Sequence, residues 1–157
     1  MTAPLAVPRL DQQLCFAIYG AGQAMTRAYK ALLAPLGLTY PQYLVMLVLW
    51  EHGELAVNEI GARLGLDSGT LTPLLKRMQA GGFVRRQRAP EDERIVRISP
   101  TAAGLALQQA ACRVMLDLGD KLGMTQDQAD DLRERLKALK AGLDASETRG
   151  ERLTEAS

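Results

Sequence analysis

The stretch that decides the fold is LDSGTLTPLLKRMQAGGFVRRQRAPEDERIVRISP, residues 66–100. Its first half predicts a helix, because residues 67–70 supply cap-forming side chains and Gly81 and Gly82 follow the last apolar position. Its second half predicts a β-hairpin of residues 83–88 and 94–99, since both runs are rich in β-compatible residues and the charged connection contains Pro90.

The segments on both sides are predicted to be helical, because apolar residues recur at spacings of three and four. Cap-forming residues open these segments, and glycine or proline closes several of them. The predicted helices are residues 10–33, 39–52, 57–64, 101–122 and 125–143, and the polar end, residues 145–157, is expected to be frayed. Short adjacent helices followed at once by a hairpin are typical of a winged helix-turn-helix. The predicted fold is mainly α with a small β-hairpin wing.

The composition fits one domain, residues 1–157, with 47% hydrophobic and 24% charged residues. The net charge is only +1, but residues 76–97 hold seven basic side chains against three acidic ones. A basic segment of this kind suits one face that meets phosphate. The longest strongly apolar run, residues 43–50, is far shorter than a membrane span, and the first residues do not resemble a secretory signal. We therefore expect a cytoplasmic protein that binds double-stranded DNA and no membrane.

The predicted DNA-binding residues are hydroxyl or charged side chains on the helix and the hairpin. Hydroxyls at the helix start can meet base edges, and later basic residues can hold the phosphate backbone. An arginine just after the hairpin turn suits a narrow minor groove, with an aspartate two residues earlier orienting it. An ordinary helix cap, a solvated face and a surface salt bridge are the competing interpretations. The candidates are Ser68, Thr70, Thr72, Lys76, Arg77, Arg86, Asp92 and Arg94.

Cys15 is the candidate redox residue. It lies near the start of the first predicted helix, where the helix dipole lowers a thiol pKa, and Tyr19 shares its face. A phenolic hydrogen bond favours the thiolate, the form that attacks peroxide. Tyr29 cannot reach Cys15 within this helix, because fourteen residues at about 1.5 Å each separate them by roughly 21 Å. An antiparallel second copy would bring the two together; alternatively, Cys15 is a small buried hydrophobe.

Residues 10–51, which include LDQQLCFAIY and LTYPQYLVMLVLWE, together with residues 66–104, resemble the organic-hydroperoxide-responsive repressors of the MarR family. The resemblance implies a homodimer formed through residues 10–35 and 101–145, with residues 40–100 as the DNA-binding region. It also implies that phenols matching Tyr29 and Tyr40 reach Cys15 across the dimer, with Tyr19 nearby. Reduced protein would then bind operator DNA, and oxidation of Cys15 by an organic hydroperoxide would release it.

Cys112 departs from this pattern, because the resolving cysteine of some family members falls about two turns later, near Asp120. Cys112 is either a resolving partner of Cys15 or a packed small residue; in the second case a low-molecular-weight thiol resolves the oxidised cysteine. A repressor released by a reversible small-molecule effector and a thiol peroxidase are the alternative functions. No cofactor is expected, and His52 has no second nitrogen ligand for a metal.

Overall fold

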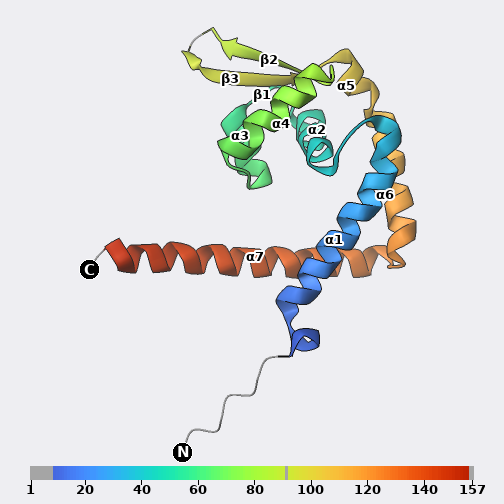
Figure 1. The fold of residues 1–157 in the computed structure, drawn as a ribbon, viewed down its shortest axis with the longest axis vertical. Helices are drawn as coiled ribbons and strands as arrows, with labels where there is room; N and C mark the ends of the chain where they lie inside the picture. The colour runs from blue at the N-terminus through green and yellow to red at the C-terminus, as the bar shows by residue number, and fades with distance from the viewer. Residues whose placement is uncertain (1–8, 91, 156–157) are drawn as a thin grey trace, which may run out of the picture. The chain divides into compact units, whose positions relative to one another are not determined.

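The computed structural model describes residues 9–90 and 92–155, of which 147–155 are described by their backbone alone. The elements divide into two compact units, Met1–Leu118 and Gly119–Ser157. Figure 1 labels them along the chain. In order they are η1 (Leu10–Gln12), α1 (Leu14–Leu33), η2 (Ala34–Leu36), α2 (Tyr40–His52), β1 (Leu55–Ala56), α3 (Val57–Leu64), α4 (Ser68–Ala80), β2 (Val84–Ala89), β3 (Asp92–Pro100), α5 (Ala102–Ala106), α6 (Gln108–Leu122) and α7 (Gln126–Glu155).

The sheet confirms the predicted hairpin and adds a strand to it. β2 pairs with β3 antiparallel, with Arg86 opposite Ile98 and a register shift between Arg88 and Ala89. β1 pairs with the other side of β3, so the strand order is β1-β3-β2. Two residues are too few to show alternation, and β1 was therefore not predicted. The structure confirms a mainly helical chain with a small β wing.

The core of the first unit lies between α2, α3, α4 and the sheet. α4 contributes one complete apolar face, because residues spaced three and four apart point the same way on a helix. Full burial of each such side chain stabilises the fold by roughly 1.5–3 kcal/mol. The largest fully buried side chains are Tyr43, Leu33, Met46, Leu49, Ile60, Leu71, Leu75, Met78, Ile98, Val45 and Val84.

The base of the wing is joined to α5 by a close backbone approach. The main-chain N–H and the hydroxyl of Thr101 both donate to the Phe83 carbonyl, and the hydroxyl also donates to the Gly82 carbonyl at 2.6 Å. A Cβ added to Gly104 would lie 2.2 Å from the same Phe83 oxygen. The indole N–H of Trp50 donates to the Gly104 carbonyl at 3.0 Å. Only glycine fits this position, and it ties α2 to the start of β2.

Three predicted helix bounds were wrong. The first helix is interrupted at Gln13, whose extended backbone separates η1 from α1. The helix predicted over residues 101–122 is broken after α5, because Gly104 is a poor helix former held against Phe83 and Leu107 packs on the core. The last helix runs to Glu155, beyond the predicted end at residue 143, so the segment expected to fray is helical in its backbone as far as Glu155.

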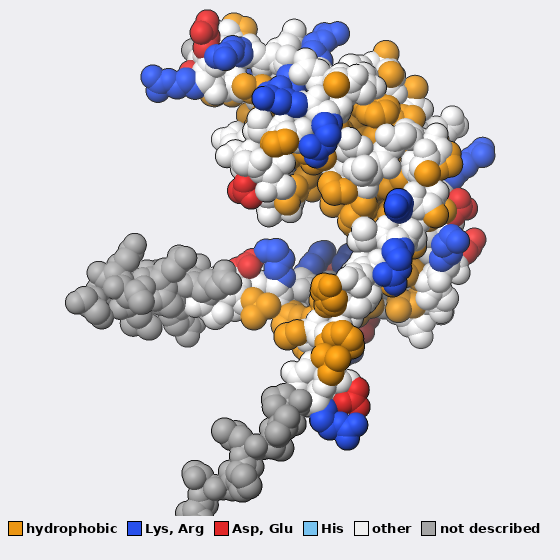
Figure 2. All heavy atoms as spheres, viewed as in Figure 1, with side chains coloured by type: hydrophobic (Ala, Val, Ile, Leu, Met, Phe, Trp, Pro, Cys, Tyr) orange, Lys and Arg blue, Asp and Glu red, His pale blue; other side chains and the backbone are white. Residues whose placement is uncertain are grey.

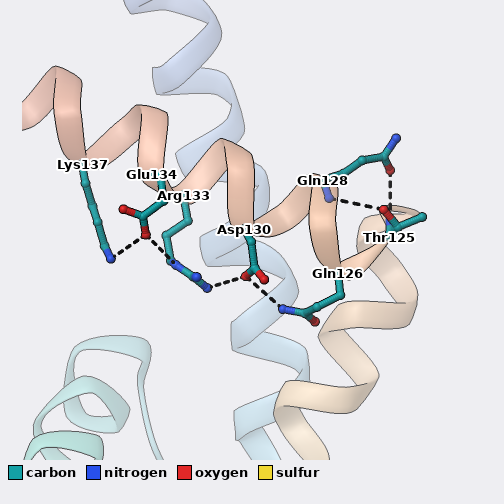
Figure 3. A network of polar contacts seen from close by, with 7 residues as sticks. All are labelled: Thr125, Gln126, Gln128, Asp130, Arg133, Glu134 and Lys137. Carbon is teal, nitrogen blue, oxygen red and sulfur yellow. Dashed lines mark hydrogen bonds and ion pairs between the residues drawn. The ribbon is translucent and has the colours of Figure 1, made fainter.

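Polar side chains stabilise α7 from its first turn (Figure 3). The main-chain N–H of Thr125 donates to the side-chain oxygen of Gln128. In return, the main-chain N–H of Gln128 donates to the Thr125 hydroxyl. Arg133 then pairs with Asp130 at 2.8 Å, and Lys137 pairs with Glu134 at 2.9 Å. Such reciprocal caps and pairs three or four residues apart favour a helix, each by tenths of a kcal/mol up to about 1 kcal/mol.

No single helix among the described residues is long and apolar enough to cross a membrane. Only the bent pair Leu14–Leu36 and Tyr40–His52, whose two arms differ in direction by 68°, reaches the necessary length and composition when taken together.

We expect Gly104→Ala to destabilise the protein by roughly 1–3 kcal/mol, because the new methyl group would overlap the Phe83 carbonyl. Urea unfolding at one fixed protomer concentration measures this. Gly142→Ala is the matched control: its Cβ meets nothing within 4 Å, so it should stabilise α7 by about 0.5–1 kcal/mol. A Gly104→Ala protein as stable as the wild type would contradict the close approach.

Candidate nucleic-acid interface and thiol site

Asp67 caps the N-terminus of α4. Its carboxylate accepts the main-chain N–H and the hydroxyl of Thr70, both at 2.9 Å. These bonds hold the pKa of Asp67 below its usual range, the main-chain bond contributing most. The cap therefore stays ionised near neutral pH and sets where α4 begins. The Thr70 hydroxyl donates its hydrogen to the cap, which leaves its oxygen able to accept.

α4 has one buried face and one exposed face. Leu71, Leu74, Leu75 and Met78 are buried in the core. The residues predicted to contact DNA lie on the rest of the helix, where Thr72 is half-buried and the others are exposed. Figure 2 shows blue Lys and Arg side chains spread over the region of α4, β2 and β3. The exposed DNA-binding candidates on α4 are Ser68, Thr70, Lys76 and Arg77.

At the end of the β2–β3 hairpin, two side chains bind main-chain groups. The Asp92 carboxylate accepts the main-chain N–H of Arg94 at 2.9 Å, and the Arg88 guanidinium donates to the Glu93 carbonyl at 3.1 Å. This bond from Asp92 orients the backbone at Arg94. The sequence had predicted that Asp92 orients the Arg94 guanidinium. The Arg94 side chain is exposed at the end of the hairpin.

Arg86 is the candidate that lies closest to the core. It is half-buried on β2, and among the described residues its buried Nε has no hydrogen-bond partner. It lines a shallow hollow with Gln79 of α4 and with Gln87, Arg88 and Val96 of the hairpin. A buried donor without an acceptor costs free energy.

Cys15 is the second residue of α1 and is exposed with a free thiol. The surrounding first turns of α1 are apolar and also exposed: Leu14 is 63% exposed, Phe16 46% and Tyr19 62%. The Tyr19 hydroxyl accepts the side-chain N–H of Gln23 at 2.7 Å and remains able to donate.

Tyr29 and Tyr40 lie together at the other end of α1. Their rings stack at 4.4 Å between centroids, and both pack against the core. Burial above all, with Tyr40 and Tyr43 adding to it, raises the pKa of Tyr29 from 10.0 to about 12. Tyr29 therefore stays a protonated donor over the physiological range. One chain therefore brings these two phenols together, whereas Cys15 lies fourteen residues before Tyr29 on α1.

Tyr43 is a member of this cluster that the sequence analysis missed. Its ring lies 5.7 Å from that of Tyr29, and its hydroxyl is buried without a hydrogen-bond partner in the described residues. Burial, then Cys112, then Tyr40 raise the pKa of Tyr43. Cys112 is an exposed free thiol on α6. The spacing of three between Tyr40 and Tyr43 on one helix was the signal that could have revealed it.

Among the described residues, no group of three or more His, Cys, Asp or Glu side chains is placed to hold a metal ion. At the end of α2, Nε2 of His52 lies 3.7 Å from Oε2 of Glu51.

A helix pair, α3 and α4, is followed directly by the β2–β3 hairpin, and β1, just before α3, completes the three-stranded sheet. This arrangement defines a winged helix-turn-helix protein. The MarR family model matches residues 38–96. The chain is 52% identical to the HTH-type transcriptional regulator TtmR of Methylorubrum extorquens, over 87% of this chain and 70% of that protein. It is 47% identical to the organic hydroperoxide resistance transcriptional regulator of Bacillus subtilis, over 83% of this chain and 87% of that protein. The chain belongs to the MarR family, which confirms the predicted resemblance.

Solved structures of AbfR from Staphylococcus epidermidis have the same fold. Reduced AbfR bound to DNA matches with a TM-score of 0.76 at 35% identity, over 87% of this chain and 93% of that one. The disulfide form of AbfR matches with a TM-score of 0.64 at 37% identity, over 83% and 92%.

The raised pKa of Tyr29 gives a pH-dependent stability. Because the folded protein holds this proton more tightly than the unfolded chain, the contribution is fully present below pH 10 and is lost as the pH rises from 10 to about 12. Ultraviolet titration should show one phenol fewer ionising in this late range in Tyr29→Phe than in the wild type, while buried Tyr43 continues to ionise late. Tyr19→Phe is the control and should keep the full late transition; a late transition of unchanged amplitude in Tyr29→Phe would refute the assignment.

Proposed function

We propose that the protein is a homodimeric transcriptional repressor that binds operator DNA while Cys15 is reduced and releases it when an organic hydroperoxide oxidises Cys15. The observation that carries the proposal is one helix, α1, with an exposed thiol at its start and a phenol at its end, attached to a winged helix-turn-helix. The similarity to a hydroperoxide resistance regulator and to DNA-bound reduced AbfR supports it. The protein would act in the cytoplasm, as a regulator and not as an enzyme.

The DNA-binding part of the proposal rests on α4 and the wing. α4 keeps its apolar face in the core and presents hydroxyls and basic groups outward, as a recognition helix in the major groove requires. Arg94 at the end of the hairpin would enter the minor groove. Arg86, which lines the hollow beside α4, would meet a phosphate with its guanidinium.

The homodimer is supported by apolar side chains that no other part of the described chain covers. They lie within residues 10–35 and 101–145, the predicted dimerisation segments. Clustered exposed apolar side chains are typical of an interface. On the second unit, the spacing of residues 132, 136 and 143 places them on one face of α7. The exposed residues are Leu10, Leu14, Phe16, Ile18, Tyr19, Leu105, Met115, Leu116, Leu122, Met124, Leu132, Leu136 and Leu143.

A second copy would also complete the thiol site. Tyr29 and Tyr40 of one protomer would donate to the Cys15 thiolate of its partner, with Tyr19 close by, as the family resemblance implies. The thiolate attacks one peroxide oxygen, a sulfur–oxygen bond forms as the oxygen–oxygen bond breaks, and the alkoxide leaves as an alcohol after taking a proton. A small thiol then displaces water from the sulfenic acid to give a mixed disulfide. Cys112 is not required for this route.

We expect Lys76→Ala and Arg94→Ala to weaken operator binding. Loss of a phosphate contact at Lys76 should lower the slope of log affinity against log salt by about 1, and loss of Arg94 should cost about 1–3 kcal/mol at A·T-rich positions. Arg135→Ala removes an exposed arginine that is paired with Asp131 on α7 and is the control. Fluorescence anisotropy with labelled operator at several salt concentrations measures both effects. Equal losses in all three proteins would exclude α4 and the wing as the interface.

We expect one equivalent of cumene hydroperoxide to release the wild-type protein from operator DNA, with release reversed by dithiothreitol. Cys15→Ser should bind DNA with similar affinity and stay bound, while Cys112→Ser should behave as the wild type. Anisotropy together with mass spectrometry of the intact protein gives both readouts. Release of operator DNA by oxidised Cys15→Ser protein would refute the sensing proposal. Recovery of DNA binding by dialysis alone would favour a reversible effector. Sustained peroxide turnover without DNA affinity would favour a thiol peroxidase.

A further inference from the structure

Four aromatic rings form a continuous line from the phenol pair towards the wing. Tyr40 stacks on Tyr29 at 4.4 Å, and Tyr29 contacts Tyr43 at 5.7 Å. Tyr43 meets Trp50 edge to face at 6.3 Å between centroids. These distances lie within the range at which aromatic rings interact favourably. The line therefore joins the end of α1 to the last turn of α2.

Trp50 connects this line to the backbone under the wing. Its indole N–H donates to the Gly104 carbonyl at 3.0 Å, across 54 residues of sequence. Gly104 lies against the Phe83 carbonyl, which also accepts the main-chain N–H of Thr101. Phe83 immediately precedes β2, and Gly81 and Gly82 before it end α4. One hydrogen bond thus links the aromatic line to the junction between the recognition helix and the hairpin.

The packing of the line makes it stiff. Tyr43 is 1% exposed, and in the described residues its hydroxyl has no partner, so its ring is held by packing alone. Met46, which is fully buried, would lie 3.0 Å from a Cβ on Gly104. Close-packed interiors respond to a displacement by changing between discrete arrangements. A movement of Tyr29 would therefore displace Tyr43 and Trp50 together.

We infer that Trp50 is a positioning residue that transmits the state of the Cys15 site to the wing through Tyr43 on one side and the Gly104 carbonyl on the other. The inference rests on the proposed function, because it takes Tyr29 and Tyr40 as the phenols that respond to Cys15 oxidation. Oxidation changes what these phenols contact, and the aromatic line carries that change to the end of α4. The coupling needs both the ring contact and the hydrogen bond of Trp50.

The first test uses Trp50 as its own reporter, because it is the one tryptophan of the chain. We expect its emission to change when one equivalent of cumene hydroperoxide oxidises the wild-type protein in the absence of DNA, and to recover with dithiothreitol. Cys15→Ser should show no change under the same conditions. Unchanged emission in wild-type protein that mass spectrometry shows to be oxidised at Cys15 would overturn the inference.

The second test separates coupling from sensing. Trp50→Phe keeps an aromatic ring but removes the N–H donor, and Tyr43→Phe keeps its ring and removes only the unpartnered hydroxyl. We expect Trp50→Phe to oxidise at Cys15 as fast as the wild type and to bind operator within about twofold when reduced, but to lose roughly five- to tenfold less affinity on oxidation. Tyr43→Phe should release DNA as the wild type does.

The outcomes distinguish this inference from the proposed function. If oxidised wild-type protein keeps its operator affinity, the proposed function fails. If it releases DNA and Trp50→Phe releases it over the same peroxide range and by the same factor, the positioning role of Trp50 is overturned while the proposed function stands. Thermal unfolding and reduced-state affinity show whether Trp50→Phe is folded; if it is not, the emission of wild-type Trp50 decides.

Discussion

The structure depends on one close backbone approach, that of Gly104 to the Phe83 carbonyl. Phe83 is the last residue before β2, and Gly104 lies in the first helix after β3, so this contact closes the two ends of the wing on each other. The Trp50 N–H and the Thr101 side chain satisfy the carbonyl groups beside it. A Cβ at position 104 would overlap the Phe83 carbonyl, so only glycine allows this approach. The position of the wing relative to α4 therefore depends on Gly104.

A second constraint is that α1 is divided between two environments. Its last turns pack Tyr29 and Leu33 against the core, while its first turns leave Leu14 and Tyr19 more than half exposed. A straight helix cannot bend its own start back to its end, so a thiol at the start and a phenol at the end cannot meet within one chain. The exposed apolar side chains and the proposed redox chemistry of Cys15 therefore both favour a second copy of the chain.

Much of the fold could be predicted from the sequence, because its signals are local. Thr39 with Gln42, Asp67 with Thr70, and glycines 65, 81 and 82 mark helix ends through contacts within a few residues. What could not be predicted depends on distant contacts: β1 exists only because β3 pairs with it, and the break at Leu107 follows from packing on the core. At the site, Cys15 and the phenols matching the family were recognisable, whereas Tyr43 and Trp50 acquire their roles through rings brought together by the fold.

The aromatic line explains how a small chemical change could act on DNA binding in a protein of this kind. Adding one oxygen to a sulfur changes only contacts within a few ångströms. The basic residues predicted to meet DNA lie on other elements, α4 and the wing. A dimer must hold two recognition helices about one helical turn of DNA apart, so a slight rotation at the α4–β2 junction is sufficient to lose half-site spacing. Rings packed edge to face transmit such a displacement better than flexible aliphatic side chains, because they have few alternative rotamers. In the proposed route, Trp50 lies between the phenols and Gly104 and would turn that displacement into a movement of the backbone.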